Sequence, residues 1–214
     1  RFSIFLLFLI VGCALNAQDD YRNYVLSRTM LNGTGTSYLD NITYYDGLGR
    51  PFQTVQKAVS DDKFLNKNLV TLQEYDAAGR EWNSWLPTFA GSSDYLAPAS
   101  IKSSAPGNYD NDSRPYSQPV YEASPLNRLT AQYGPGVAWY NAGRSVKTEY
   151  LLNTNASPLK CIKYGVNSTG GLTGDSTTFY TSGELSVVKT TDEDLNVSYS
   201  FTDKQGHTVL TRQM

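Results

Sequence analysis

The side chains that most often carry catalysis or bind metals are scarce in this chain. It has one histidine, His207, and two cysteines, Cys13 and Cys161. A zinc site needs three or four such ligands, and a Ser-His-Asp arrangement needs a histidine available for that role. His207 follows a glycine at a position where related segments of the chain carry arginine, so a repeat accounts for it. We therefore predict no metal site, no cofactor and no histidine-based catalysis.

Carboxylates remain as an alternative, because two Asp or Glu side chains suffice for glycoside hydrolysis and the chain has 20 of them. Their positions favour turns. Asp46, Asp76 and Asp203 each lie three residues before a glycine, and residues 192–194 form an acidic run typical of a solvated turn. Residues 110–113 lack the Gly and distal Glu of a calcium loop. We predict no catalytic residue and keep a carboxylate-based glycosidase as a third hypothesis.

Tryptophan side chains could bind a ligand without catalysis. Trp82, Trp85 and Trp139 could stack on sugar rings, or they could simply cover a thin sheet. An extracellular carbohydrate-binding or adhesive module, with surface glycans as partners, is therefore the alternative hypothesis for function.

A repeat organises the chain. The string Tyr-Asp-x-x-Gly-Arg occurs twice, and two weaker copies follow. We assign the four copies to residues 42–60, 70–86, 119–139 and 197–214. The residues that define them are Tyr45, Asp46, Gly49 and Arg50 in the first copy, Tyr75, Asp76, Gly79 and Arg80 in the second, Tyr121, Asn127 and Arg128 in the third, and Asp203 and Gly206 in the fourth.

Each copy is predicted to be a strand, a turn and a second strand. An Asp side chain can accept hydrogen bonds from amides two residues further on, and Gly supplies the positive φ that closes a tight hairpin. Asn127 stands in the glycine position of the third copy, and Asn is the next best residue for left-handed backbone. The Arg after each turn could stack on an aromatic ring of a neighbouring copy, so that a ladder of such pairs joins successive hairpins.

Composition supports an all-β fold. The chain has 17 Gly and 16 Tyr, and only 18% of its residues are charged. We predict antiparallel hairpins that form an extended, curved sheet, with a long loop insertion at residues 87–118, where Ser, Pro, Gly, Asn and Asp are frequent. Residues 167–175 are expected to be a Gly-rich loop, and Cys161 a small strand or edge residue.

The first residues predict export. Phe2–Val11 is an apolar run preceded by Arg1 and followed by small residues, which is typical of a signal peptide at residues 1–17. Cleavage after Ala17 is one interpretation, and the other is a lipoprotein anchored through Cys13. We expect no transmembrane helix after this segment, because the run is too short to span a bilayer and a polar sequence follows. The net charge of -2 argues against a nucleic-acid partner.

These features together resemble the RHS/YD-repeat family. The two Tyr-Asp-x-x-Gly-Arg units, the segments 121–128 and 134–139, and the segment 201–206 are similar to the uncharacterised amino-terminal domain that opens many RHS-repeat proteins of gram-negative bacteria. The resemblance covers most of residues 23–214, so residues 18–214 are expected to form one RHS-type amino-terminal β domain. We expect the chain to be the amino-terminal part of a longer protein.

The resemblance implies a structural role. In the family, long repeat-built shells enclose a variable carboxy-terminal polypeptide, which is frequently a toxin used between competing cells. The implied function is a non-catalytic amino-terminal segment of a secreted or cell-surface shell, in a polymorphic toxin system. Its partners would be the rest of its own shell and a carboxy-terminal toxin cargo. No residue of this chain is expected to carry toxin activity.

Overall fold

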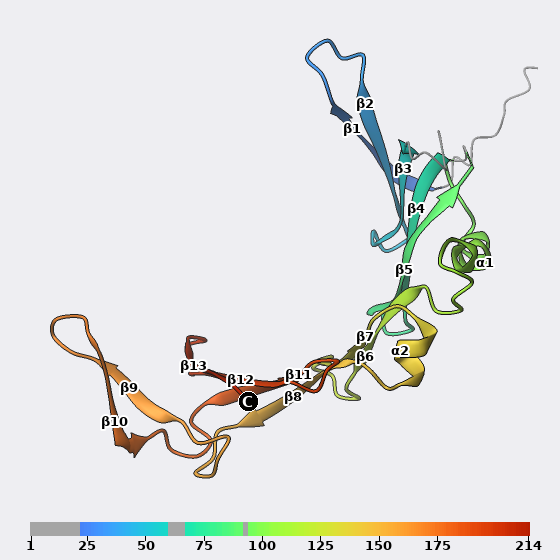
Figure 1. Ribbon diagram of the computed structural model, residues 1–214. Helices are drawn as coiled ribbons and strands as arrows, with labels where there is room; N and C mark the ends of the chain where they lie inside the picture. Colours follow the sequence, from blue (N-terminus) through green and yellow to red (C-terminus); the bar gives the residue numbers. More distant parts are fainter. Residues whose placement is uncertain (1–21, 60–66, 92–93) are drawn as a thin grey trace, which may run out of the picture.

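The computed structural model describes residues 22–59, 67–91 and 94–214, and it is mostly β-sheet (Figure 1). Eleven strands form one sheet, in the order β1 to β8 and then β11, β12 and β13, while β9 and β10 pair separately. All the paired strands are antiparallel. The expectation of an all-β fold built from antiparallel hairpins is confirmed. The expected signal peptide at 1–17, including Cys13, lies outside the described residues.

The described strands and helices have the following bounds. The strands are β1 (Asn23–Met30), β2 (Tyr38–Tyr45), β3 (Pro51–Val59), β4 (Lys67–Tyr75), β5 (Glu81–Ala90), β6 (Tyr116–Tyr121), β7 (Leu129–Tyr133), β8 (Val146–Leu152), β9 (Ile162–Val166), β10 (Leu172–Phe179), β11 (Ser186–Thr191), β12 (Val197–Thr202) and β13 (Thr208–Gln213). The helices are α1 (Pro98–Asn108) and α2 (Val137–Asn141).

The sheet is long and curved. Figure 1 shows strands β1 to β5 rising on the upper right and strands β8, β11, β12 and β13 lying below and to the left, so that the sheet bends between the two groups. Both helices lie outside this bend. Because consecutive strands alternate in direction, the β2–β3, β4–β5, β6–β7 and β12–β13 connections lie at the same end of their strands.

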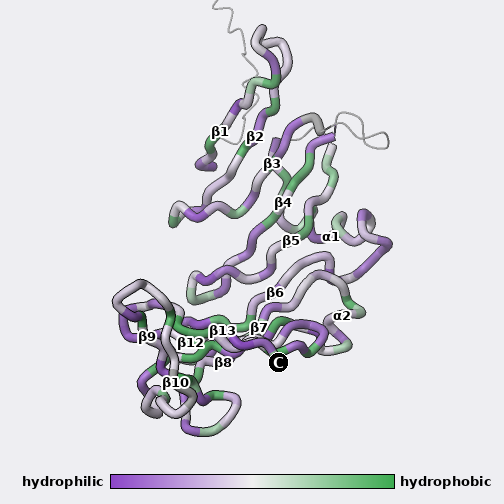
Figure 2. Tube along the Cα trace, turned by 60° about the vertical axis from the view of Figure 1, so that its left-hand side comes forward, coloured by the Kyte–Doolittle hydropathy of each residue, from purple (hydrophilic) through white to green (hydrophobic). Residues whose placement is uncertain are grey.

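Alternation of apolar and polar residues explains which face of the sheet is buried. In β2 and β4 three alternate residues are buried, Asp40, Ile42 and Tyr44 in β2 and Asn68, Val70 and Leu72 in β4. Two separate clusters result, one in each half of the sheet, and Figure 2 shows hydrophobic segments in both halves. The first contains Ile42, Tyr44, Val55, Val70, Leu72, Ala90 and Ile101, and the second contains Cys161, Leu185, Val187, Tyr199 and Phe201.

The segment 87–118, expected to be a loop insertion, is more regular than its composition suggests. Strand β5 continues to Ala90, β6 begins at Tyr116, and helix α1 lies between them. The helix has almost no amphipathic pattern in sequence, yet Ile101 and Ala105 lie one turn apart and are both fully buried. Burial against β4 and β5 thus stabilises a helix that local propensity would not predict.

A second segment outside the sheet, residues 153–185, connects β8 to β11. We call it and the segment 87–118 the two excursions. The structure differs from two expectations here. Residues 167–175 are not a continuous Gly-rich loop, because a tight turn at 167–171 leads directly into β10. Cys161, expected to be a small strand or edge residue, lies just before β9 and outside the strand, and its side chain is fully buried in the second cluster. Burial raises the pKa of the Cys161 thiol. The excursion therefore supplies core residues to the second half of the sheet.

Buried amide side chains attach both excursions to the sheet. Gln53, 1% exposed, donates from Nε2 to the carbonyl of Leu96 (2.7 Å) and accepts from its amide (3.3 Å) just before α1. Asn153, 0% exposed, donates to the Thr181 carbonyl (2.9 Å) and accepts from the Leu185 amide (2.8 Å). Each side chain satisfies backbone groups that would otherwise be buried without partners.

Candidate functional site

The first turn is built around the carboxylate of Asp46. Its Oδ1 accepts hydrogen bonds from the amides of Leu48 (2.9 Å) and Arg50 (3.0 Å), and the Gly49 amide donates to the Asp46 carbonyl (3.0 Å). Gly49 has a φ of 77°, in the left-handed region where a side chain is strained. The Arg50 guanidinium then binds Asp46 Oδ2 through Nε (2.8 Å). Asp, Gly and Arg of the repeat thus have the separate roles in the turn that their order predicts.

The second and fourth copies repeat this geometry, whereas the third copy is longer, with six residues from its acidic residue to its arginine instead of four. Asp76 bonds to Ala78, Gly79 and Arg80 in the same pattern, and Asp203 bonds to Gln205, Gly206 and His207. In the third copy Glu122 is the acceptor for Arg128, and Asn127 takes the glycine position with a φ of 52°. We call the turns at 46–50, 76–80, 122–128 and 203–207 the turn row.

Hydrogen bonding lowers the pKa of every acidic residue in the turn row. Backbone and side-chain bonds from Arg50 hold the pKa of Asp46 below its ordinary value, and Arg80 and His207 do the same for Asp76 and Asp203. The Arg128 guanidinium, with the Ser124 hydroxyl, lowers the pKa of Glu122 to about 2. Each of these carboxylates is therefore stabilised as an anion by the hydrogen bonds of its own turn.

Two further turns have the same hydrogen bonds, although their sequences do not match the repeat. Asp192 accepts from the amides of Asp194 (2.9 Å) and Asn196 (2.8 Å), and Asn167 accepts from those of Thr169 (3.1 Å) and Gly171 (2.7 Å). The shared sequence signal is an Asp or Asn whose side chain accepts hydrogen bonds from the backbone amides two and four residues later. It was hidden because the tyrosine and arginine of the repeat are absent from both segments.

Arginine and tyrosine side chains join successive turns. The Arg50 guanidinium lies 4.2 Å from the centre of the Tyr75 ring, and its Nη1 donates to the Gly79 carbonyl (3.1 Å). The Tyr75 hydroxyl returns a hydrogen bond to the Pro51 carbonyl (2.7 Å). The first turn is thereby held to the second by three contacts outside the strand ladder.

The stacking of arginine on tyrosine recurs in the next two steps. Arg80 lies 4.6 Å from the Tyr121 ring centre and donates to Asn127 Oδ1 (3.1 Å), and Arg128 lies 4.4 Å from the Tyr150 ring centre. The three pairs together form the arginine–tyrosine ladder. Among the described residues no cation stacks on Tyr45, which is where the ladder begins. His207, in the arginine position of the last turn, has a side chain that is 77% exposed.

The three tryptophans do not share a surface. Trp85 packs against the first cluster, and its indole donates to Glu74 (2.9 Å), as does Asn83 (3.0 Å). Trp82 alternates with those residues and so points to the opposite face of β5. Trp139 lies on α2 and is 49% exposed. No common sugar-binding platform is formed by these three side chains.

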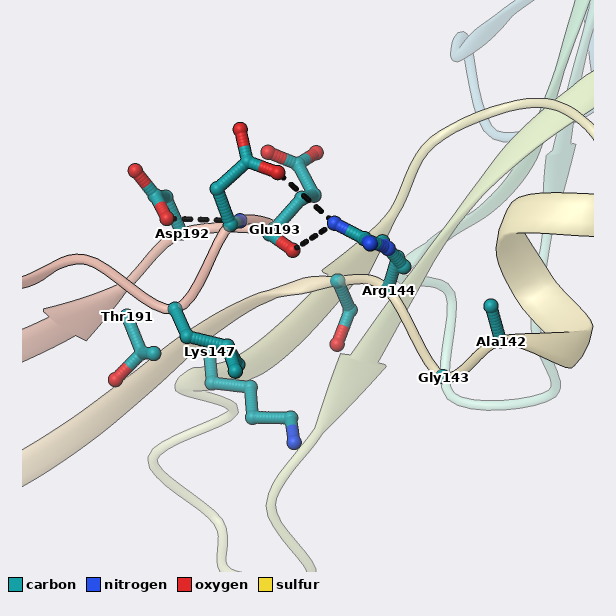
Figure 3. A pocket seen from close by; sticks show the side chains of 10 residues that line it. Ala142, Gly143, Arg144, Lys147, Thr191, Asp192 and Glu193 are labelled. Atoms are coloured by element: carbon teal, nitrogen blue, oxygen red, sulfur yellow. Dashed lines mark hydrogen bonds and ion pairs between the residues drawn. The ribbon is translucent and has the colours of Figure 1, made fainter.

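One hollow is lined by residues of both charges from the start of β8 and from the turn between β11 and β12 (Figure 3). Arg144 donates to the Asp194 carboxylate (2.9 Å) and to the Glu193 carbonyl (3.1 Å), while Asp192 caps its own turn. No cluster of His, Cys, Asp and Glu suited to a metal ion occurs in the described part of the chain. The acidic run at 192–194 therefore belongs to a turn and an ion pair.

Comparison with protein families identifies the family of this chain. Residues 18–152, more than half of the 214 residues, match the family described as Domain of unknown function (DUF6443). This chain belongs to that family. No curated protein and no solved structure matches it. In the described residues, no helix is long and apolar enough to cross a membrane.

Proposed function

We propose that this chain is a non-catalytic structural segment from the amino-terminal part of an exported or cell-surface shell protein of the RHS/YD-repeat type. The observation that carries the proposal is the arginine–tyrosine ladder, which joins three consecutive turns by repeated contacts. A ladder of this kind lengthens a sheet one hairpin at a time, and each step provides the same attachment for the next. The turn-row carboxylates are bound as structural anions, which further supports a scaffold.

The proposal identifies where the shell would continue. Strand β13 is the last strand of the sheet, and His207 occupies the ladder position that arginine holds in earlier copies. A following hairpin would pair with β13 and place an aromatic ring over His207. The enclosed partner would be a carboxy-terminal polypeptide of the same protein, such as a toxin.

Cryo-electron microscopy of the full-length parent protein tests this assignment. We expect further Tyr-Asp-x-x-Gly-Arg hairpins to extend the sheet from β13 and to enclose a lumen. A domain that hangs from a linker, with β13 exposed to solvent, would show that the chain is not part of a shell.

Export is tested separately, by protease accessibility on intact cells and mass spectrometry of the mature amino terminus. We expect the protein to be accessible and to begin at Gln18. A diacylglyceryl group on Cys13 would instead identify a lipoprotein, and a protein protected inside the cell would contradict export.

A further inference from the structure

Strand β1 is the terminal strand of the sheet at the end opposite to β13, and within the part of the chain that the structure describes it lacks the usual protection of such strands. All eight of its residues are exposed, and its register with β2 is uninterrupted from Asn23 to Met30. Natural edge strands are often protected by a Pro, a bulge or charged side chains, especially Lys, which hinder pairing with another chain. The sequence Asn-Tyr-Val-Leu-Ser-Arg-Thr-Met has no Pro, no Lys and no bulge, and its only charged residue is Arg28.

The single charge of β1 is neutralised within its own hairpin. Arg28 binds both oxygens of Asp40 (2.7 and 2.8 Å), and its guanidinium lies 3.7 Å from the centre of the Tyr38 ring. The remaining side chains on the same face are apolar and about half exposed, with Tyr24 at 52%, Leu26 at 50% and Met30 at 56%. Nothing on this strand would repel an incoming strand.

The hydrogen bonds between β1 and β2 determine which backbone groups of β1 face outward. The Leu31 amide donates to the Ser37 carbonyl (2.8 Å), so this pair is one that exchanges hydrogen bonds. Bonded and non-bonded pairs alternate along an antiparallel ladder. The odd-numbered residues of β1 therefore bond to β2, and the even-numbered residues point their amide and carbonyl groups away from the sheet.

These outward groups are symmetric about one residue. They belong to Tyr24, Leu26, Arg28 and Met30, whose midpoint is Ser27. We infer that β1 pairs antiparallel with β1 of a second copy of this chain, about a two-fold axis at Ser27. In this register every outward group of both strands finds a partner within the strand. A register centred on Leu26 would leave Met30 to pair with a residue before the strand begins.

The side chains fit the same register. Leu26 lies opposite the partner's Arg28, and Tyr24 lies opposite the partner's Met30, which is a favourable sulfur–aromatic contact. The two copies of Arg28 lie diagonally across the pair, and each is bound to Asp40 of its own chain. Pairing would also bring the half-exposed apolar residues of the two copies side by side, so that each copy shields part of the other. This self-complementarity favours a second copy over an unrelated peptide.

Cysteine cross-linking tests the axis directly. In a Cys13→Ser background, Ser27→Cys would place two thiols opposite each other with Cα atoms about 4.5–5.5 Å apart, within disulfide range. Val25→Cys is the matched control, because the two copies of residue 25 would lie roughly 13 Å apart along the strands. Cys161 is fully buried and does not compete. We expect a disulfide-linked dimer from Ser27→Cys and monomer from Val25→Cys on non-reducing gels.

Light scattering over a concentration series gives the second measurement. Leu26→Pro removes an outward amide but no bond to β2, and edge strands tolerate proline at such positions. We expect it to keep the circular dichroism spectrum of the parent chain and to weaken dimerisation roughly tenfold or more. A parent chain that is monomeric at all concentrations, or equal cross-linking of both cysteine variants, would overturn the inference. The proposed shell function does not depend on either result.

Discussion

At the scale of single residues, the turn row depends on backbone conformation more than on contacts. A Cβ added at Gly49 would meet no atom within 4 Å, whereas at Gly79 it would lie 3.1 Å from Arg50 Nη1. Both glycines have positive φ, at 77° and 81°. The two positions therefore separate the cost of backbone strain from the cost of disturbing the ladder.

Glycine substitutions should show this difference. We expect Gly49→Val to destabilise the chain by at least about 1–2 kcal/mol, because a side chain is strained in left-handed backbone, and Gly79→Val to cost more, because it also displaces Arg50. Gly49→Asn should cost less, since Asn127 adopts this conformation naturally. Urea unfolding measures all three, with Gly47→Ala as the control in open space. Unchanged stability in both valine variants would contradict the turn mechanism.

The ladder makes a prediction about pairs of residues. A double-mutant cycle with Arg50→Ala and Tyr75→Ala should give a coupling free energy of about 0.5–1 kcal/mol, because the guanidinium stacks on a partly exposed ring. The pair Arg50 and Tyr121 is the control, since Arg80 is the residue that contacts Tyr121. Equal coupling in both cycles would mean that the contacts between adjacent turns are not specific.

At the scale of elements, a few buried side chains attach irregular segments to a regular sheet. Asn153 is the clearest case, because its amide is donor and acceptor to backbone groups at the end of the β9–β10 excursion. Gln53 does the same for the segment before α1. Both amides lie on strands or at their ends, yet each organises a segment more than twenty residues away.

Replacement of Asn153 tests this role. Asn153→Asp keeps the shape but exchanges the donor for an acceptor that faces the Thr181 carbonyl. We expect a loss of about 1–3 kcal/mol or more, since buried polar groups lose their partners. Thermal unfolding measures the loss, and Asn155→Asp is a control in an exposed position. If the two variants unfold at the same temperature, the Asn153 amide does not hold the excursion in place.

At the scale of the whole molecule, many carboxylates with lowered pKa values make stability depend on pH in one direction. Asp46, Asp76, Glu122, Asp192 and Asp203 are all shifted downward by hydrogen bonds to their charged forms. A folded-state pKa below the unfolded value stabilises the fold above the unfolded pKa. That contribution is lost as the pH falls through the folded pKa.

The acid limb of the stability curve should therefore be steep. We expect the midpoint of chemical unfolding to fall progressively below about pH 4.5, the ordinary value for glutamate, and for Glu122 to continue falling to about pH 2. Glu122→Gln should be less stable at neutral pH and should show a shallower slope in that window. A slope identical to that of the parent chain would show that Glu122 does not contribute.

The hairpins follow from short stretches of the chain, because their causes are local. An Asp side chain reaches amides two and four residues away, and a glycine adopts positive φ without help from distant parts of the chain. For the same reason the copies at Gly49, Gly79 and Gly206 share one spacing from their Asp residues, whereas the copy at Asn127 is two residues longer and is related to them by its residue types. The stacking of arginine on tyrosine could be anticipated as a kind of contact, because both side chains flank each turn.

How those hairpins pack against one another depends on tertiary contacts. Helix α1 forms because Ile101 and Ala105 are buried against strands β4 and β5 that end before it begins, and no local pattern records that burial. Which tyrosine each arginine meets, the outward direction of alternate groups in β1 and the attachment of the excursion by Asn153 all depend on strand order. Strand order comes from contacts between distant segments, and these are absent from any short stretch of sequence.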